Sequence, residues 1–293
     1  MPDVFIPTPR GQMPAWLAVP SNSGPVPGVV ILHDIFGMTQ DHRNQAKWLA
    51  EAGFESLSVD LYYQGGVLRC VRSVMREIMA RSGPAFDDVE AARSWLLAQP
   101  NSNGKAGVVG FCMGGGFALM LASGHGFSAA SVNYGGKLPD DFEAFLETAC
   151  PVVGSYGGKS KMEEGVAEQL EQALHRALVP HDVKEYPDAG HGFMNNHGWF
   201  FLKLLRFTGM GYNDPATMDA RSRIVGFFHT HLDRWSKQRF DADNTKYRFS
   251  FWSASDSVYA TPSGRIDPCG SPVNFRDAAN RPERVSLTGA SRI

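Results

Sequence analysis

Short runs of apolar, β-branched residues recur along the first two thirds of this chain, and amphipathic segments separate them. Such a run predicts a strand buried on both faces, and the 3.6-residue spacing between runs predicts helices. Strands that alternate with helices form a mostly parallel central sheet with helices on both faces, so the fold class is α/β. Strands are expected at 14–19 (an edge strand), 28–33, 55–59, 105–111, 128–134, 151–156 and 181–186, and helices at 40–51, within 71–98, and at 113–123, 161–177 and 217–236.

The length and composition agree with one large domain. The chain has 293 residues, of which 43% are hydrophobic, and this is enough to build a full core. We assign residues 1–239 to a single domain and residues 240–293, which are polar and show little periodicity, to a loosely ordered extension. Residues 199–207 are densely apolar; we interpret them as a short packing helix, and a lid over the site is the alternative.

Charge and cysteine usage exclude several classes of function. The net charge of −2 argues against a nucleic-acid partner and against a charged membrane surface. No apolar run approaches the roughly 20 residues of a membrane-spanning helix, and the N-terminus lacks a signal-peptide pattern. The four cysteines form no CxxC pair, so we expect neither a metal site nor a disulfide framework. We therefore expect a cytoplasmic protein without a cofactor; the oligomeric state stays open.

Reactive side chains follow the predicted strands at the point where each strand ends. Ligands of an open parallel sheet bind beyond these carboxyl ends. Asp34, Asp60, Cys112, Ser160 and His191 each come shortly after a different predicted strand. The sequence therefore predicts a reaction site at this edge of the sheet.

The segment GFCMGG, Gly110 to Gly115, is the sharpest motif. It has the G-x-nucleophile-x-G form of a nucleophile elbow between a strand and a helix, where small neighbours relieve a strained turn. The helix N-terminus favours a thiolate on Cys112. A buried, inert cysteine at a glycine-rich helix start is the alternative, but the strand before and the helix after favour the elbow.

His191 lies between two glycines after the last predicted strand. A loop histidine is usually a solvated bystander, but the order nucleophile, acid, histidine along the chain matches that of elbow enzymes. We therefore predict that His191 is the general base that serves Cys112.

Four segments together resemble the dienelactone hydrolase family: VILHDIFG from Val30, Asp60-Leu61-Tyr62, the cysteine elbow, and YPDAGHGF from Tyr186. The resemblance covers roughly residues 14–236. It implies an α/β-hydrolase fold and acyl transfer through a thiolate, with a small ester or lactone as substrate. It also implies that Ile35 and Met113 supply the backbone N–H groups of an oxyanion hole.

The chain departs from the family pattern at the acidic positions. Asp34 stands where the family has a glutamate that contacts the thiol; the shorter side chain could instead cap a turn, and both interpretations stay open. Ser160 stands in the slot of the triad acid, and a serine cannot hold a positive imidazole by charge. Either His191 is unsupported or a nearby carboxylate replaces the acid; the candidates by position are Glu163, Glu164 and Asp188.

The substrate-binding positions depart as well. Gln64 and Asn195 stand where the family has two arginines that bind the substrate carboxylate. Arg69 and Arg72 lie near the first of these positions and could compensate, although such arginines are more often surface charges. We therefore expect an uncharged substrate.

The leading hypothesis is a cysteine-dependent hydrolase of small carboxylic esters or lactones, weakened by Ser160. The alternative is a hydrolase-fold protein that has lost efficient catalysis and binds a ligand or partner. A thiol-redox role ranks last because no resolving cysteine is evident. A carboxylate within hydrogen-bond reach of His191 would favour the enzyme.

Overall fold

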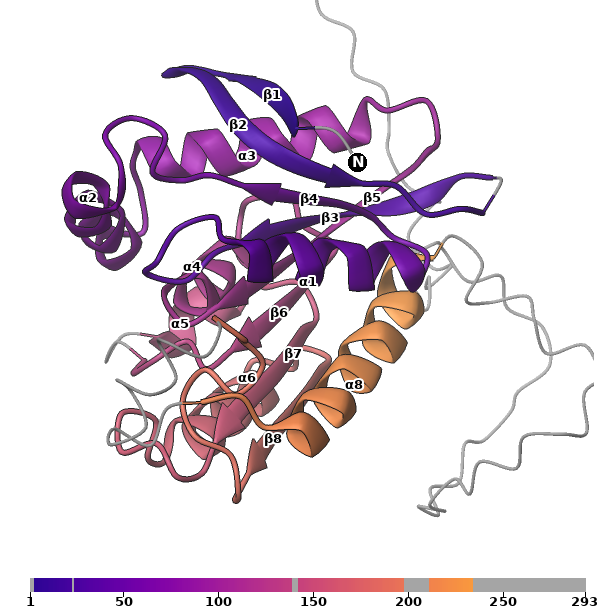
Figure 1. Ribbon diagram of the computed structural model, residues 1–293. Coiled ribbons are helices and arrows are strands. Elements are labelled where there is room, and N and C mark those ends of the chain that lie inside the picture. Colours follow the sequence, from indigo (N-terminus) through magenta and orange to yellow (C-terminus); the bar gives the residue numbers. More distant parts are fainter. Residues whose placement is uncertain (1–2, 23, 139–141, 198–210, 234–293) are drawn as a thin grey trace, which may run out of the picture. The chain divides into compact units, whose positions relative to one another are not determined.

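The computed structural model describes residues 3–22, 24–138, 142–197 and 211–233 (Figure 1). Within these residues eight strands form one sheet in the order β1-β2-β4-β3-β5-β6-β7-β8. The pairs β1–β2 and β2–β4 are antiparallel, and every other neighbouring pair is parallel. The predicted α/β fold with a mostly parallel sheet is therefore confirmed. The strands are β1 Asp3–Thr8, β2 Gly11–Ala18, β3 Val26–Leu32, β4 Glu55–Val59, β5 Ser102–Phe111, β6 Ala129–Asn133, β7 Val152–Gly157 and β8 His181–Tyr186.

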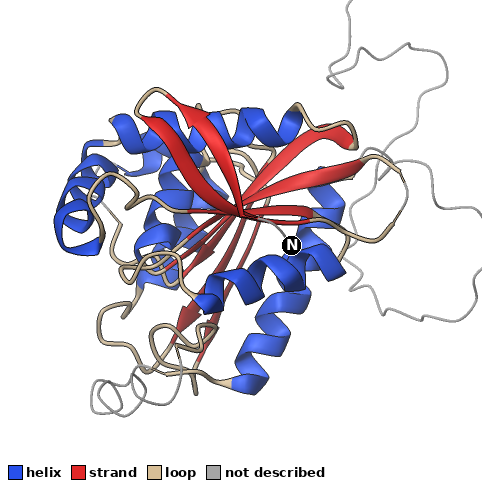
Figure 2. Cartoon of the chain, turned by 45° about the horizontal axis from the view of Figure 1, so that its top comes forward, coloured by secondary structure: helices blue, strands red, loops and turns tan. Residues whose placement is uncertain are grey.

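Helices cover both faces of the sheet, as the alternating pattern predicts (Figures 1 and 2). Side chains of α1 and α8 join one buried cluster, and side chains of α2 to α6 join a second cluster across the sheet. Every residue of β3, β4, β6 and β7 is buried, as expected for strands that are covered on both faces. The helices are α1 Gln40–Glu51, α2 Val67–Ala80, α3 Pro84–Leu97, α4 Met113–Leu121, α5 Phe142–Leu146, α6 Val166–Arg176 and α8 Asp214–Leu232.

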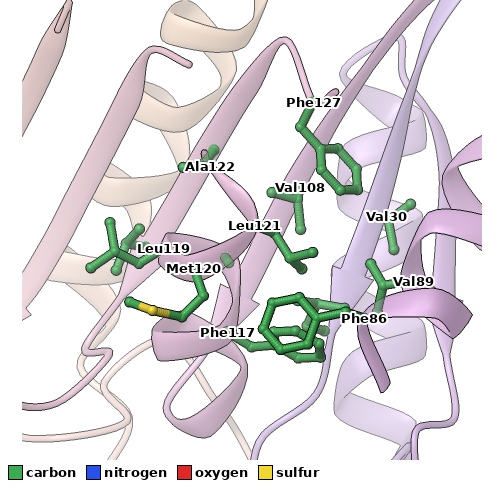
Figure 3. Close-up of a cluster of buried hydrophobic side chains, with 14 of the residues drawn as sticks. Val30, Phe86, Val89, Val108, Phe117, Leu119, Met120, Leu121, Ala122 and Phe127 are labelled. Carbon is green, nitrogen blue, oxygen red and sulfur yellow. The ribbon is translucent and has the colours of Figure 1, made fainter. Parts of the chain in front are cut away.

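The second cluster fixes α4, the helix that follows Cys112. Phe117 of α4 packs edge-on against Phe86 of α3, with ring centroids 4.7 Å apart, and Leu121 lies beside Val108 of β5 (Figure 3). Phe117, Leu121 and Val108 are completely buried. Each such side chain stabilises the fold by about 1.5–3 kcal/mol, so the start of α4 is held rigidly at the end of β5.

The structure differs from the sequence prediction at the ends of the sheet. The strand expected at the edge, 14–19, is the second strand, because β1 pairs outside it. Strand β1 was not predicted, because its proline and polar residues hide an alternation in which Phe5 is exposed and Ile6 is buried. The short helix α5 was also not predicted.

The described elements belong to one unit, Met1–Asp241. The segment 199–207, interpreted as a packing helix or lid, and the whole extension predicted at 240–293 lie outside the described residues. Among the described helices, none is both long and apolar enough to cross a membrane.

Candidate active site

Cys112 lies in the sharp turn between the end of β5 and the start of α4. Its backbone has φ 55° and ψ −116°, a conformation that costs a non-glycine residue about 1–3 kcal/mol. A Cβ atom at Gly110 would overlap the carbonyl oxygen of Gly114, and one at Gly114 would overlap that of Leu32. The elbow predicted from GFCMGG therefore exists, and its two glycines are required by the close approach of backbone segments.

The thiol of Cys112 faces the imidazole of His191. The Nε2 nitrogen of His191 lies 3.0 Å from Sγ, so one proton can pass between them. His191 sits in the loop after β8, where it is 7% exposed and packs edge-on against the ring of Tyr134. The structure thus brings together the predicted nucleophile and the predicted base, which are 79 residues apart.

Glu163 holds the other side of the His191 ring. One carboxylate oxygen bonds to Nδ1 of His191, and the other accepts the backbone N–H of Gly157 at 3.0 Å. Burial disfavours a charge on His191, but the hydrogen bonds to Cys112 and Glu163 outweigh it and raise the pKa of the imidazole to about 10. The ring is therefore held as an imidazolium between two acidic partners.

Glu163, and not Ser160, occupies the position next to the imidazole. Successive turns after β7 return the chain on itself, because Ser160 N–H bonds to the carbonyl of Gly157 and Glu163 N–H to that of Ser160. Among the described hydrogen bonds, none joins Ser160 to His191. The family resemblance places the triad acid at Ser160. The carboxylate that contacts His191 belongs to Glu163, three residues later, whose longer side chain reaches back to the ring.

The other acidic candidates point elsewhere. The side chain of Asp188 is 91% exposed and pairs with Lys159 at 3.5 Å, and Glu164 is exposed. The sequence could not rank Glu163 above Glu164, because both follow the same strand and only the turn decides which one faces inward.

Asp34 lies at the end of β3 and its carboxylate has two partners. One oxygen accepts the N–H of Phe36 at 2.8 Å, and the other lies 2.7 Å from Nε2 of His197. Burial opposes the charge on Asp34, but the hydrogen bonds from His197 and Phe36 and the nearby imidazoles of His42 and His197 together outweigh it, so the pKa of Asp34 is lowered. The pKa of His197 is raised, because its interactions with Asp34 and the nearby Asp41 outweigh the effect of burial. No hydrogen bond between Asp34 and Cys112 occurs in the described part of the chain, so the geometry favours the turn-capping interpretation.

His197 is a site residue that the sequence analysis missed. It reads as one more loop histidine, and nothing in its neighbours marks a contact with Asp34, which is 163 residues earlier in the chain. It packs edge-on against Phe36, with ring centroids 5.0 Å apart. The Asp34–His197 ion pair forms part of the wall that Cys112 faces.

The predicted oxyanion-hole residues flank the thiol. Ile35 and Met113 both line the same cavity as Cys112. Met113 is the first residue of α4, so its N–H has no partner within the helix. Neither this N–H nor that of Ile35 donates a hydrogen bond to another described residue. Both groups are therefore available to an oxygen that binds beside the thiol.

The cavity beside Cys112 has a volume of about 560 Å³. Its described lining includes His191, Asn195 and the methionines Met75 and Met162, and it contains no lysine or arginine. Asn195 is buried and ties the loop to α1, accepting from Tyr134 at 2.6 Å and donating to Asp41 at 2.7 Å.

Three of the polar side chains considered for substrate binding are not part of this described lining. Gln64 donates to the carbonyl of Arg10 at 2.7 Å on the exposed surface. Arg69 and Arg72 are likewise absent from the described wall. The described residues also hold no group of three or more His, Cys, Asp or Glu side chains arranged for a metal ion.

Comparison with known proteins decides the family. The sequence model of the dienelactone hydrolase family matches residues 13–232, about three quarters of the chain. This chain belongs to the dienelactone hydrolase family. The resemblance seen in its motifs is thereby confirmed, and this dienelactone hydrolase family member is a hydrolase.

Relatives and solved structures agree with this membership. Carboxymethylenebutenolidase from Pseudomonas putida is 32% identical over 212 residues, which cover 69% of this chain and 85% of that protein. A dienelactone hydrolase-like promiscuous phosphotriesterase from metagenomic libraries is 22% identical, with a TM-score of 0.68 over 79% of this chain and 98% of that one. Dienelactone hydrolase from Anabaena variabilis is 19% identical, with a TM-score of 0.56 over 79% and 98%. The two structures show the α/β-hydrolase fold.

Proposed function

We propose that this hydrolase cleaves small, uncharged carboxylic esters or lactones through an acyl-thioester on Cys112. The observation that carries the proposal is the continuous hydrogen-bonded chain from the Cys112 thiol through His191 to Glu163. A nucleophile, a base and an orienting acid in this order are the parts that acyl transfer requires.

In the first half of the reaction, the thiolate of Cys112 attacks the carbonyl carbon of the substrate. The carbonyl π bond breaks and the oxygen becomes an oxyanion, which accepts hydrogen bonds from the N–H groups of Ile35 and Met113. The tetrahedral intermediate collapses, the C–O bond of the ester breaks, and the leaving alkoxide takes the proton of His191. Cys112 is then an acyl-thioester and His191 is neutral.

In the second half, a water molecule gives a proton to His191 and attacks the thioester carbonyl. The C–S bond breaks, the carboxylic acid leaves, and the thiolate–imidazolium pair is restored. Glu163 is proposed to hold the imidazole with Nε2 toward the thiol and to stabilise its positive charge in both halves. From a lactone, the same steps give a hydroxy acid.

The cavity wall supports an uncharged substrate. A bound carboxylate calls for a cation, and the described lining contains no lysine or arginine. The charges of Asp34 and His197 compensate each other, so this pair does not balance the charge of a substrate carboxylate. The butenolide part of the name of the Pseudomonas putida relative, carboxymethylenebutenolidase, agrees with a lactone substrate, whereas the carboxy group in that name has no cationic partner in the described lining of this cavity.

The hypothesis of a degenerate binding protein required His191 to lack a carboxylate partner. The bond from Glu163 supports an enzyme instead. We further propose that the protein acts in the cytoplasm on a small molecule, without a nucleic-acid or membrane partner. Its net charge of −2 and the free thiols of Cys70, Cys112 and Cys150 support this setting.

Hydrolysis of para-nitrophenyl acetate by the purified protein tests the proposal. Wild type should turn over the ester, and Cys112→Ala should fall to the rate of buffer alone. Cys150→Ala is the matched control, because it removes a partly buried thiol that is not among the described lining residues. Equal rates for wild type and Cys112→Ala would overturn the role of Cys112.

A further inference from the structure

His33 is a buried histidine that the proposed reaction does not use. It follows β3 directly, has no exposed surface and is not among the described residues that line the cavity. No role for His33 was predicted from the sequence. A fully buried imidazole needs a partner for each nitrogen, so its hydrogen bonds show what it holds in place.

The partners of His33 define which nitrogen carries the proton. Its Nε2 lies 3.1 Å from the backbone N–H of Leu61, which can only donate, so Nε2 is the acceptor. In a neutral ring Nδ1 then carries the proton, and it donates to the carbonyl oxygen of Asp34 at 2.7 Å. Burial lowers the pKa of His33, which keeps the ring neutral and preserves this tautomer.

The carbonyl that His33 holds belongs to the same peptide unit as the N–H of Ile35. In a trans peptide the C=O and the N–H lie in one plane and point in opposite directions. A donor that fixes the Asp34 carbonyl on one side therefore fixes the direction of the Ile35 N–H on the other. The bond also polarises the peptide and strengthens that N–H as a donor.

We propose that His33 is a positioning residue that aims the Ile35 N–H at the oxyanion formed beside Cys112. This inference rests on the proposed function, because it assigns a role in stabilising the oxyanion of that reaction. His33 does not touch the substrate; it acts through the peptide between Asp34 and Ile35.

The surroundings of His33 make it a rigid support. Its ring packs edge-on against Tyr62, with centroids 4.5 Å apart. The hydroxyl of Tyr62 lies 3.4 Å from the carbonyl of Ile35 and 3.3 Å from the sulfur of Met113, so it contacts both oxyanion residues. The bond from Leu61 ties His33 to the end of the neighbouring strand β4.

His42 of α1 provides a comparison, because it bonds to the same turn from the opposite side of Asp34. Its Nε2 accepts the N–H of Asp34 at 3.3 Å, and its Nδ1 lies 3.2 Å from the hydroxyl of Thr39. It is as buried as His33 but bonds to the peptide before Asp34, not to the one that carries the Ile35 N–H. His42→Asn is therefore a matched control for the loss of a buried histidine that contacts this turn.

The test compares His33→Asn with His33→Leu. The two side chains have nearly the same shape, but only asparagine can donate to the Asp34 carbonyl from the position of Nδ1. With para-nitrophenyl acetate, His33→Leu should lower kcat by about 10- to 100-fold with little change in KM, somewhat less than the loss of a whole oxyanion-hole donor. His33→Asn should recover most of this loss.

The ratio of kcat for an oxygen ester to kcat for the matching thionoester separates a role in the oxyanion hole from a purely structural role, because a general loss of structure should lower both rates alike. The sulfur of a thionoester accepts hydrogen bonds more weakly than oxygen, so an ordered oxyanion hole favours the oxygen ester. His33→Leu should lower the ratio of oxoester to thionoester kcat at least several-fold. His33→Asn and His42→Asn should keep the wild-type ratio.

The outcomes separate this inference from the proposed function. Equal kcat values and equal ratios for His33→Leu and His33→Asn would overturn the role of His33, even while wild type hydrolyses the ester. Absence of turnover by wild type would overturn the proposed function itself. If His33→Leu does not fold, His33→Gln replaces it. Glutamine can still accept the N–H of Leu61 but has no donor at the position of Nδ1. His33→Gln should therefore show the same decrease in the ratio of oxoester to thionoester kcat.

Discussion

The carboxylate of Glu163 bonds to Nδ1 of His191, 28 residues further along the chain, while the opposite nitrogen of the ring faces the Cys112 thiol. Glu163 is 1% exposed, so water does little to stabilise its charge. The backbone N–H of Gly157 and the imidazole are the partners that stabilise it. A buried acid with this geometry has an orienting role that substitution can measure.

Glu163→Gln should lower kcat for an activated ester by about 10²- to 10³-fold. The loss should be smaller than the roughly 10⁴-fold loss of a serine protease that loses its triad carboxylate, because a thiol needs less help to ionise. Ser160→Ala and Ser160→Asp should both stay near the wild-type rate, since Ser160 makes no described bond to His191. A large gain from Ser160→Asp would show that the acid position at Glu163 is incomplete.

The charge on His191 gives stability a defined pH dependence. Its pKa is about 10 in the folded protein and about 6.5 when unfolded, so the folded state binds the proton more tightly. The stabilisation is fully present below pH 6.5 and is lost as the pH rises through 10. Urea unfolding of wild type and His191→Gln should therefore show a free-energy difference that narrows between pH 6.5 and pH 10. A difference that stays constant across this range would contradict a raised pKa.

The pair formed by Asp34 and His197 should couple energetically. His197→Ala removes a hydrogen-bond and ionic partner from the Asp34 carboxylate, which is 2% exposed, and this should lower the free energy of unfolding by about 1–3 kcal/mol. Adding Asp34→Asn should restore part of the loss, because a neutral amide needs no counter-charge. Urea unfolding of the two single variants and the double variant completes the cycle. Simple additivity of the two losses would show that the pair does not interact.

The elbow glycines should tolerate no side chain. Gly110→Ala forces a Cβ atom into the carbonyl of Gly114, and we expect a protein that is unfolded or insoluble. Gly226 in α8 is the matched control, since no described atom lies within 4 Å of the Cβ that alanine would add. Gly226→Ala should raise the free energy of unfolding by about 0.5–1 kcal/mol, the usual gain for a glycine inside a helix. Thermal unfolding of both variants gives the comparison.

Sequence patterns predicted the parts of the site that depend on local chemistry. The elbow around Cys112 follows from a glycine motif between a strand and a helix, and His191 follows from its place after the last strand. The partners of these residues depend on how loops turn in three dimensions, which the sequence does not encode in a short motif. Glu163 faces inward only because the chain turns twice after Gly157. His197 meets Asp34 across 163 residues, with no local signal in either segment.

The same distinction holds for the fold. Buried strands such as β3 and β5 were predicted because their residues are apolar on both faces. The edge strand β1 was missed because one of its faces is exposed and its pattern is that of a loop with prolines. Its position depends on pairing with β2, a relationship between two segments and not a property of either one.

Trapping the acyl-enzyme shows directly whether Cys112 forms a thioester with the substrate. Wild-type protein is mixed with para-nitrophenyl acetate, quenched in acid within the first turnover, and measured by intact-protein and peptide mass spectrometry. We expect one acetyl group, carried by the peptide that contains Cys112, and no acetyl group at that peptide in Cys112→Ala. Turnover of the ester with no adduct on Cys112, or with the adduct on another residue, would contradict a thioester mechanism at this elbow.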